Sequence, residues 1–194
     1  SNAISIDKVF SAKNRKKHGF TEDIKWRVML ARNLANVFSE LHKNKYLVVD
    51  TKPANIFTYK SVPAVCILDC DSFRYGKDYS SLYITDEYIA PETDPEDPKS
   101  VKEIQDVFAL SVLVFQLLNN GIHPFQGINK TNNDFHIQEL INQRSYPYGK
   151  ETDKTLDPSP VSTHHFFPED LFDFFDAVFR EGKRRKASTL VKIL

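Results

Sequence analysis

An acid, a base and an amide stand close together in the stretch LVVDTKPANIF, residues 47–57. Asp50, Lys52 and Asn55 separate one apolar run from another, so a short strand is expected to end where they begin. A carboxylate accepts protons, an ammonium group neutralises negative charge, and an amide oxygen can bind a hard cation such as Mg²⁺. The alternative is a solvated surface turn, because charged residues are mostly exposed and Asn is common in turns.

A further acid, Asp69, ends the run AVCILD and is followed by Cys70 and Asp71. A carboxylate at the end of a strand can bind a metal ion, or it can cap the loop that follows. The sequence leaves both readings of Asp69 open, and Asp71 is either a second metal-binding carboxylate or an exposed loop acid.

Short β-prone runs are expected to position these residues. KYLVV and NIFTY flank the Asp50 to Asn55 turn, and AVCILD follows after a connection that contains Ser61 and Pro63. Each run is short, and Thr, Lys and Pro interrupt the first pair. The sequence therefore predicts small β-ladders and not one large sheet.

Helices are expected on either side of these runs. Apolar residues recur at helical spacing from about residue 24 to 42, with Thr21 as the predicted N-cap. Residues 101–119 have a wide apolar face that predicts deep burial, and Gly121 stands where a helix C-terminus favours glycine. Another helix is predicted in PEDLFDFFDAVF and a last one near Ala187, with long loops at about 71–100 and 145–165. The predicted fold class is mainly α with small β-hairpins.

Composition narrows the function classes. The 26 basic and 26 acidic side chains cancel, so bulk charge gives no reason for binding to nucleic acid or to an anionic membrane. No apolar stretch approaches the roughly 20 residues of a membrane-spanning helix. Cys66 and Cys70 are too few for a disulfide framework, so we expect reduced, structural thiols and a cytoplasmic protein.

Three further polar stretches are read as structural. His123 is expected to pack beside Pro124 and Phe125, and the pair His164-His165 has no partners spaced for metal binding. The run KRRK at 183–186 is read as a solvated helix end and not as a nucleic-acid patch.

Asp50-Thr51-Lys52-Pro53-Ala54-Asn55 resembles the catalytic loop of eukaryotic-like Ser/Thr protein kinases, in which His-Arg-Asp is followed at fixed spacing by Lys and Asn. Other landmarks of that family follow in order. They are Asp69-Cys70-Asp71 in place of Asp-Phe-Gly, Thr85 and Ala90-Pro91-Glu92 at the end of an activation segment (69–92), Asp106 at the start of a buried central helix, Gly121-Ile122-His123-Pro124-Phe125 after it, and Arg185.

The resemblance implies a role for each landmark. Asp50 would orient a substrate hydroxyl and accept its proton, and Lys52 would stabilise the transferred phosphoryl group. Thr85 would hydrogen-bond to both. Asn55 and Asp69 would bind Mg²⁺, and together with Lys52 they would contact ATP.

The resemblance also implies structural roles for three residues. Glu92 and Arg185 would form a buried ion pair, although both could also be half-exposed surface charges. Asp106 would accept backbone N–H groups of the catalytic loop, here residues 48–55.

The departures from the family pattern also carry predictions. Val48 and Val49 replace the usual His and Arg, so the clamp for a phosphorylated activation loop is lost and activity is expected to be independent of such phosphorylation. Asp71 replaces a glycine, which would cost backbone freedom. Asp-Cys-Asp-Ser-Phe (69–73) resembles a bacterial kinase group encoded near metal-dependent phosphatases and von Willebrand A proteins, which suggests a phosphatase partner.

The N-terminal residues bear on how much of a kinase this chain contains. Ser1-Asn2-Ala3 resembles a vector remnant, and residues 4–194 then correspond to a kinase C-terminal lobe. The residues before the first strong helix contain no Gly-rich loop and no Val-Ala-Ile-Lys-like strand. We expect an N-lobe outside this chain to hold ATP and a protein substrate to supply the hydroxyl, so this chain alone would be inactive. The alternatives are a pseudokinase or docking module that uses the helical lobe, and an unrelated helical domain.

Overall fold

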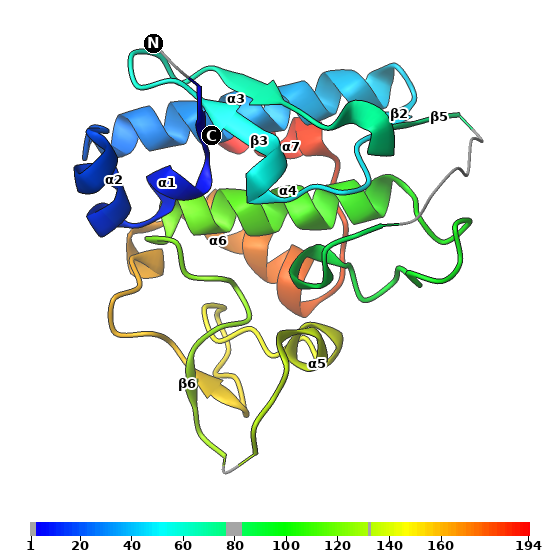
Figure 1. Cartoon of the computed structure of the whole chain (residues 1–194). Coiled ribbons are helices and arrows are strands. Elements are labelled where there is room, and N and C mark those ends of the chain that lie inside the picture. The colour runs from blue at the N-terminus through cyan, green and yellow to red at the C-terminus, as the bar shows by residue number, and fades with distance from the viewer. Residues whose placement is uncertain (1–2, 77–82, 132) are drawn as a thin grey trace.

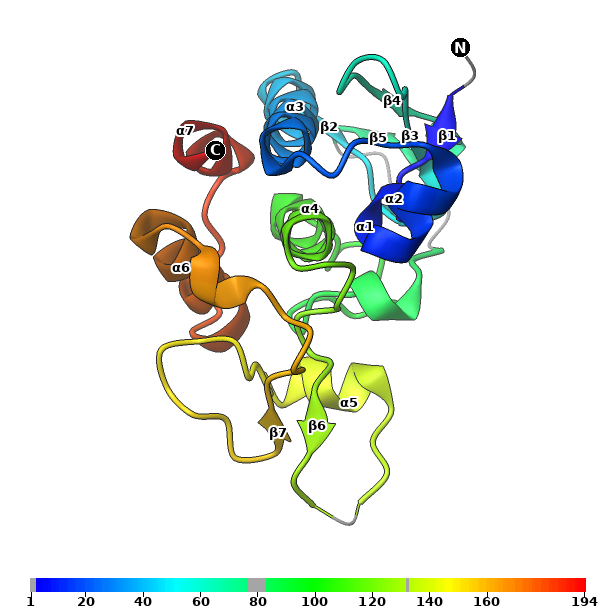
Figure 2. The same cartoon turned by 90° about the vertical axis from the view of Figure 1, so that its left-hand side faces the viewer.

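A computed structural model describes residues 3–76, 83–131 and 133–194. Helix α4 (Glu103–Leu118) lies at the centre, between α3 (Ile24–Lys43) on one side and α6 (Glu169–Phe175) on the other (Figures 1 and 2). Helix α7 (Ala187–Ile193) packs beside α3. The mainly helical architecture with small sheets confirms the predicted fold class.

Both long helices lie where the apolar spacing predicts them. Every residue of α4 from Gln105 to Leu118 is buried, and Gly121 adopts a left-handed conformation (φ 83°) that lets its N–H donate to the Gln116 carbonyl. The predicted N-cap of α3 was wrong by two residues. Asp23 caps this helix by accepting from the Lys25 N–H, whereas Thr21 accepts from the Asp23 N–H.

Three short elements precede α3, and the sequence reading assigned none of them. They are β1 (Ile4–Ser5), α1 (Asp7–Phe10) and α2 (Ala12–His18). The buried guanidinium of Arg15 donates to the Val9 and Phe10 carbonyls, which ties α2 back onto α1. Such short helices have too few turns for an apolar period to stand out, so tertiary contacts decide them.

The strands form small antiparallel ladders, as predicted. β3 (Ile56–Thr58) pairs with both β1 and β4 (Val65–Ile67), and β2 (Tyr46–Leu47) pairs with β5 (Arg74–Tyr75). A third ladder joins β6 (Ile128–Asn129) to β7 (Leu156–Asp157). Because β2 and β3 belong to different sheets, the catalytic loop spans the gap between two ladders.

Short helical turns interrupt the long loops. They are η1 (Pro53–Asn55), η2 (Cys70–Ser72), η3 (Asp86–Tyr88), α5 (Ile137–Asn142), η4 (His164–Phe166) and the π-helical η5 (Asp176–Arg180) that extends α6. Residues 77–82 of the predicted activation segment, and Ser1 and Asn2 of the predicted vector remnant, lie outside the described residues. None of the described helices combines the length and the apolar character needed to cross a membrane.

Candidate active site

The catalytic loop is fastened to the first turn of α4 through Asp106. Its carboxylate is fully buried and accepts the N–H of Val48 at 2.7 Å and that of Val49 at 2.9 Å. The Nε2 atom of His42, on α3, lies 3.0 Å from the same carboxylate. The predicted hydrogen bonds from the loop backbone to Asp106 are therefore present.

Asp50 contacts both Lys52 and Thr85. Its side chain is 5% exposed, and its Oδ2 atom lies 2.5 Å from Lys52 Nζ. The Oδ1 atom accepts from Thr85 Oγ1 at 3.0 Å and from the Thr85 N–H at 3.3 Å. The structure thus brings Asp50, Lys52 and Thr85 together. The predicted hydrogen bond between Thr85 and Lys52 is absent from the described contacts, because Asp50 lies between the two side chains.

Asn55 closes the loop on the other side of Asp50. Pro53 starts the η1 turn, and Asn55 at its end donates from Nδ2 to the Asp50 carbonyl at 3.2 Å and to Oδ2 at 3.4 Å. Because Nδ2 of Asn55 donates to Asp50, the Oδ1 atom is the side-chain atom that can accept a hydrogen bond or bind a cation. No hydrogen bond to that oxygen is found among the described residues.

The pairing of β3 with β4 brings Asp69 to the same end of the hairpin as Asn55. The register aligns Ile56 with Ile67, and the next N–H, from Leu68, donates to the Asn55 carbonyl at 2.8 Å. Asp69 follows in a left-handed conformation (φ 59°), is exposed, and its carboxylate has no partner in the described part of the chain.

These donors fit a magnesium ion that arrives with phosphate groups. Asn55 Oδ1 and the Asp69 carboxylate are hard oxygen ligands, and Mg²⁺ is commonly held by one or two carboxylates plus substrate phosphates. No set of three or more His, Cys, Asp or Glu side chains among the described residues could hold a metal ion. The oxygen donors are therefore too few for an all-protein cage but suit a phosphate-bound cation.

The conformation at residues 69–71 corrects the expectation for Asp71. Asp69, and not Asp71, takes the left-handed conformation, and Asp71 lies within the η2 turn. The residue in the usual glycine position therefore needs no glycine-like freedom here. Ser72 fixes the turn by donating to the Val48 carbonyl at 3.0 Å. Cys70 is exposed and Cys66 is half-buried, and both are free thiols.

Val49 occupies the position of the family's arginine and is fully buried. It packs with Ile84, Ile89 and Val101 in a separate apolar cluster, which we call the Val49 cluster. Its φ of 67° is unusual, because the left-handed region is costly for a β-branched residue. Hydrophobic contact therefore joins the catalytic loop to the segment that carries Thr85.

The predicted pairing of Glu92 with Arg185 was wrong by one residue. Glu92 lies 2.8 Å from Arg184 and 2.6 Å from Arg144, and its side chain is 30% exposed, so the pair is half-exposed. Arg185 is exposed and forms no ion pair among the described residues. Residues 183–186 are not helical, so neighbouring side chains point in different directions. Arg184 therefore faces inward, with its guanidinium 5.0 Å from the Phe108 ring, and Arg185 faces solvent.

The charges around Glu92 set its protonation. Partial burial acts to raise the pKa of this carboxyl, but the hydrogen bond from Arg144 and the positive charge of Arg184 outweigh it. The pKa of Glu92 consequently lies below its ordinary value, and the ion pairs persist at neutral pH.

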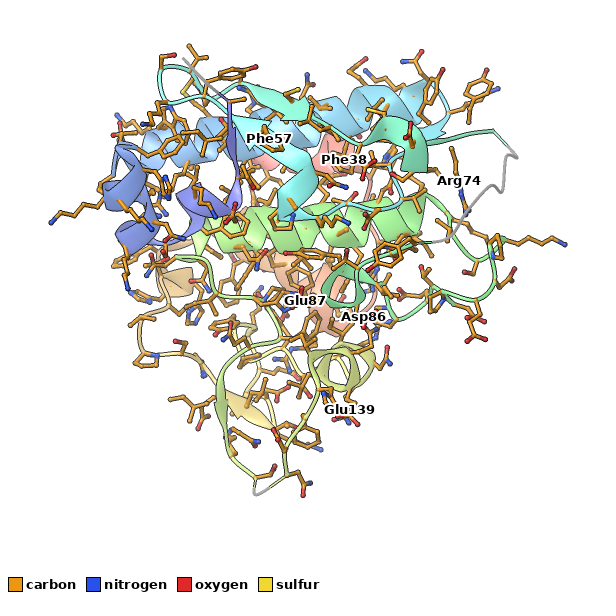
Figure 3. The ribbon with its side chains drawn as sticks, viewed as in Figure 1. Phe38, Phe57, Arg74, Asp86, Glu87 and Glu139 are labelled. Carbon is orange, nitrogen blue, oxygen red and sulfur yellow. The ribbon has the colours of Figure 1, made fainter. Side chains whose placement is uncertain are left out.

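Two cavities of similar size share Glu87 as a lining residue. One, about 490 Å³, includes Lys52 and Thr85 together with Ser5, Asp7 and Lys8. The other, about 500 Å³, lies between η3, the end of α4 and α5, and none of the predicted site residues lines it. Figure 3 shows Asp86 and Glu87 on η3 with Glu139 on α5 below them. The cavity beside Lys52 and Thr85 therefore adjoins the two side chains that contact the Asp50 carboxylate.

Sequence reasoning missed two polar residues that hold this site. Gln105 accepts from the Ala90 N–H at 2.9 Å and donates to the Tyr88 carbonyl at 2.8 Å, which fixes the segment after Thr85. His42 bonds to Asp106. The available signal was a polar residue inside an otherwise apolar helical face, because a buried polar side chain needs a hydrogen-bond partner.

Comparisons with known proteins identify the family of the chain. The model of the family described as protein kinase domain matches residues 3–191, so the chain belongs to the protein kinase domain family.

Protein kinase YegI of Escherichia coli strain K12 is 28% identical over 169 residues, which cover 81% of this chain and 26% of that protein. Protein kinase YegI of Escherichia coli O157:H7 is 26% identical over 169 residues, with the same coverage. The chain spans about a quarter of the length of these curated relatives.

Proposed function

We propose that this chain carries the catalytic loop and substrate side of an ATP-dependent protein Ser/Thr kinase, which transfers the γ-phosphoryl group of ATP to a Ser or Thr hydroxyl. The observation that supports it best is the buried Asp50 carboxylate, held between Lys52 and Thr85 beside an open cavity. Membership of the protein kinase domain family supports the general activity.

In this proposal Asp50 orients the acceptor hydroxyl and takes up its proton. Thr85 and Asn55 hold the Asp50 carboxylate in one orientation through hydrogen bonds to its two oxygens. Lys52 is 2.5 Å from Asp50 and stabilises the negative charge that develops during transfer. The contact of Thr85 with Asp50 is also the feature that favours Ser/Thr over Tyr acceptors, by resemblance to that branch of the family.

Asn55 Oδ1 and the Asp69 carboxylate would hold Mg²⁺, and Lys52 would contact phosphate oxygens. Bound Mg-ATP supplies the phosphoryl group and its leaving group. Because Asn55 also donates to Asp50, the same residue would keep the base and the metal in fixed relation.

We propose that residues 4–194 form the C-terminal lobe and that a nucleotide-covering lobe lies outside them. The residues before α3 are occupied by β1, α1 and α2, and they contain neither a Gly-rich loop nor a strand lysine. Phosphoryl transfer depends on positioning the nucleotide, so this chain alone would bind ATP weakly and lack activity. A cytoplasmic location, a protein substrate and a phosphatase partner belong to the same proposal.

The experiment is phosphotransfer by the longest product of the gene with Mg-ATP, using mass spectrometry to locate phosphate. Asp50→Asn and Asp69→Asn should each lower the rate at least a hundredfold, because one removes the base and the other a metal ligand. Asp170→Asn is the matched control, since Asp170 is an exposed acid on α6. It should keep the parental rate.

A docking module without catalysis is the second candidate, favoured by the apolar Val48 and Val49 where the family has His and Arg. If the parent transfers no phosphate to any of several acceptors while it binds partners and remains folded, the kinase proposal fails and the docking module replaces it.

A further inference from the structure

A separate small cavity lies between α3, the first turn of α4 and the start of α7. Its volume is about 230 Å³, well above the roughly 30 Å³ that one water molecule occupies in the liquid. None of the residues assigned to phosphoryl transfer lines it. The lining side chains are Ser39, His42, Lys43, Glu103, Lys186, Ala187 and Ser188.

Two polar side chains on its wall are more than nine-tenths buried and have unused hydrogen-bonding atoms. Ser39 is 7% exposed, and its hydroxyl makes no hydrogen bond with any described residue. The His42 side chain is 6% exposed, and its Nδ1 atom is buried without a hydrogen-bond partner among the described residues. Buried polar atoms are rarely left unpaired, so His42 Nδ1 points to a ligand that completes it. The Ser39 oxygen is not fully buried and adds a free hydroxyl to the same wall.

The unpaired Nδ1 of His42 has a defined role. Asp106 already accepts from the Val48 and Val49 N–H groups, and its carboxylate accepts from His42 Nε2 as well. The proton of a neutral imidazole is therefore on Nε2, and Nδ1 is left as an acceptor. The Glu103 carboxylate, 3.7 Å from Nδ1, is a second acceptor on the same wall.

The other lining groups are donors. Lys186 has no ion pair in the described part of the chain, and Lys43 has only an exposed one, with Glu40. The hydroxyls of Ser39 and Ser188 add two more donors. Cationic donors together with two acceptors suit an oxyanion that still carries a proton.

We propose that this cavity binds hydrogen phosphate or a closely related protonated oxyanion. The anionic oxygens face Lys43, Lys186 and Ser39, and the hydroxyl of the ion donates to His42 Nδ1 or to Glu103. Sulfate has the same tetrahedral shape as phosphate and a similar charge. It has no proton to donate at neutral pH, so it leaves His42 Nδ1 and the Glu103 carboxylate without a donor and repels the Glu103 charge.

The bound ion would also act on the catalytic loop through His42. His42 connects the cavity to Asp106, which holds the backbone of Val48 and Val49 immediately before Asp50. The binding itself does not depend on the proposed kinase activity, so each can fail separately.

The test is a titration of the 194-residue protein with inorganic phosphate, sulfate and chloride at equal ionic strength. The readouts are the ¹⁵N chemical shifts of the His42 ring and the melting temperature. Phosphate should shift both saturably and should bind at least tenfold more tightly than sulfate. Phosphoserine is a further probe. If it binds with an affinity comparable to that of phosphate, the cavity can also take the phosphate group of a phosphorylated side chain.

Variants connect the binding to this cavity. Lys186→Gln and Ser39→Ala should each weaken phosphate binding about fivefold or more, because each removes one donor. Lys192→Gln removes the same charge from an exposed position on α7 and should leave the affinity unchanged. The proposal is overturned if phosphate gives no saturable shift, if sulfate binds equally well, or if Lys192→Gln weakens binding as much as Lys186→Gln does.

Discussion

The two ends of α4 hold the molecule together by different means. At its first turns, Gln105 and Asp106 hydrogen-bond to the backbone of the catalytic loop and of the segment after Thr85. Near its other end, the Phe115 ring lies 5.1 to 5.9 Å from five aromatic rings, those of Tyr146, Tyr148, Phe167, Phe175 and Phe179. One helix therefore serves both as an anchor for the site and as the centre of the core.

The difference follows from the physics of the two contacts. Burial of aromatic surface contributes a large free energy with little directional demand, whereas a hydrogen bond contributes little net stability but fixes direction. The aromatic end should therefore decide how stable the fold is. The polar end should decide where Asp50 points.

The strongest test of this contrast is Phe115→Ala at the aromatic end. Removing a fully buried ring that touches five others should lower the free energy of unfolding by about 4 kcal/mol, measured by denaturant titration. The control is Phe166→Ala, since that ring is 77% exposed and should cost less than about 0.5 kcal/mol. A loss below about 1 kcal/mol at Phe115 would contradict the assignment of the core.

Asp106→Ala tests the polar end. It leaves two loop N–H groups and His42 without their acceptor, which should cost about 3 kcal/mol and shift the amide resonances of Val48 and Val49. Ser111→Ala is the control on the same helix, because within the described part of the chain the Ser111 hydroxyl bonds only to the Val107 carbonyl one turn earlier. If both variants left the two amide resonances unchanged, Asp106 would not be the anchor of the loop.

Lowering the pH should reduce the free energy of unfolding through protonation of His123. Burial lowers the pKa of this imidazole to about 4, against the weaker raising effect of its bond to the Glu87 carbonyl. Because the folded pKa lies below the unfolded value of about 6.5, protonation favours the unfolded chain. Stability from this group is complete above pH 6.5 and is lost as the pH falls toward 4, by about 3 kcal/mol.

The measurement for His123 is the free energy of unfolding at several values between pH 4 and 7. His123→Gln cannot titrate, so its profile should lack this slope even if its stability is lower throughout. Parallel profiles for the parent and the variant would show that another group is responsible.

Val101→Ala tests the Val49 cluster, the apolar contact between the catalytic loop and the segment that carries Thr85. It removes two methyl groups from the Val49 cluster and should cost about 2 kcal/mol in the free energy of unfolding. In the phosphotransfer experiment proposed above it should also lower the rate, because Ile84 and the neighbouring Thr85 would lose support. Val161→Ala, at a 61% exposed position, is the control and should be neutral. Equal effects of the two variants would rule out a role for this cluster.

The smallest effect is expected for the ion pairs of Glu92. Arg184→Gln should cost about 1 kcal/mol, because the Arg184 side chain is buried and pairs with a half-exposed carboxylate. Arg185→Gln, one residue further, should be neutral within about 0.3 kcal/mol. The reverse order of the two effects would restore the pairing with Arg185 that the sequence pattern predicted.

The sequence by itself determined the long helices, the small ladders and the order of the site motifs. The helices α3 and α4 were predictable because apolar residues repeat at the helical period over many turns. Asp50, Lys52 and Asn55 were predictable because they are close in sequence and their spacing fixes their relation within one loop. The contact of Asp50 with Thr85, and the hydrogen bonds from the Val48 and Val49 N–H groups to Asp106, followed only from a family pattern, since Thr85 and Asp106 are far along the chain.

Only the tertiary structure decided the pairings between distant residues. It selected Arg184 over Arg185, added Arg144, and gave the left-handed conformation to Asp69 and not to Asp71. It also brought His42 to Asp106 and buried Val49 against residues of the activation segment. These outcomes depend on which way one side chain points outside regular structure, and a shift of one residue there reverses the direction without changing any pattern in the sequence.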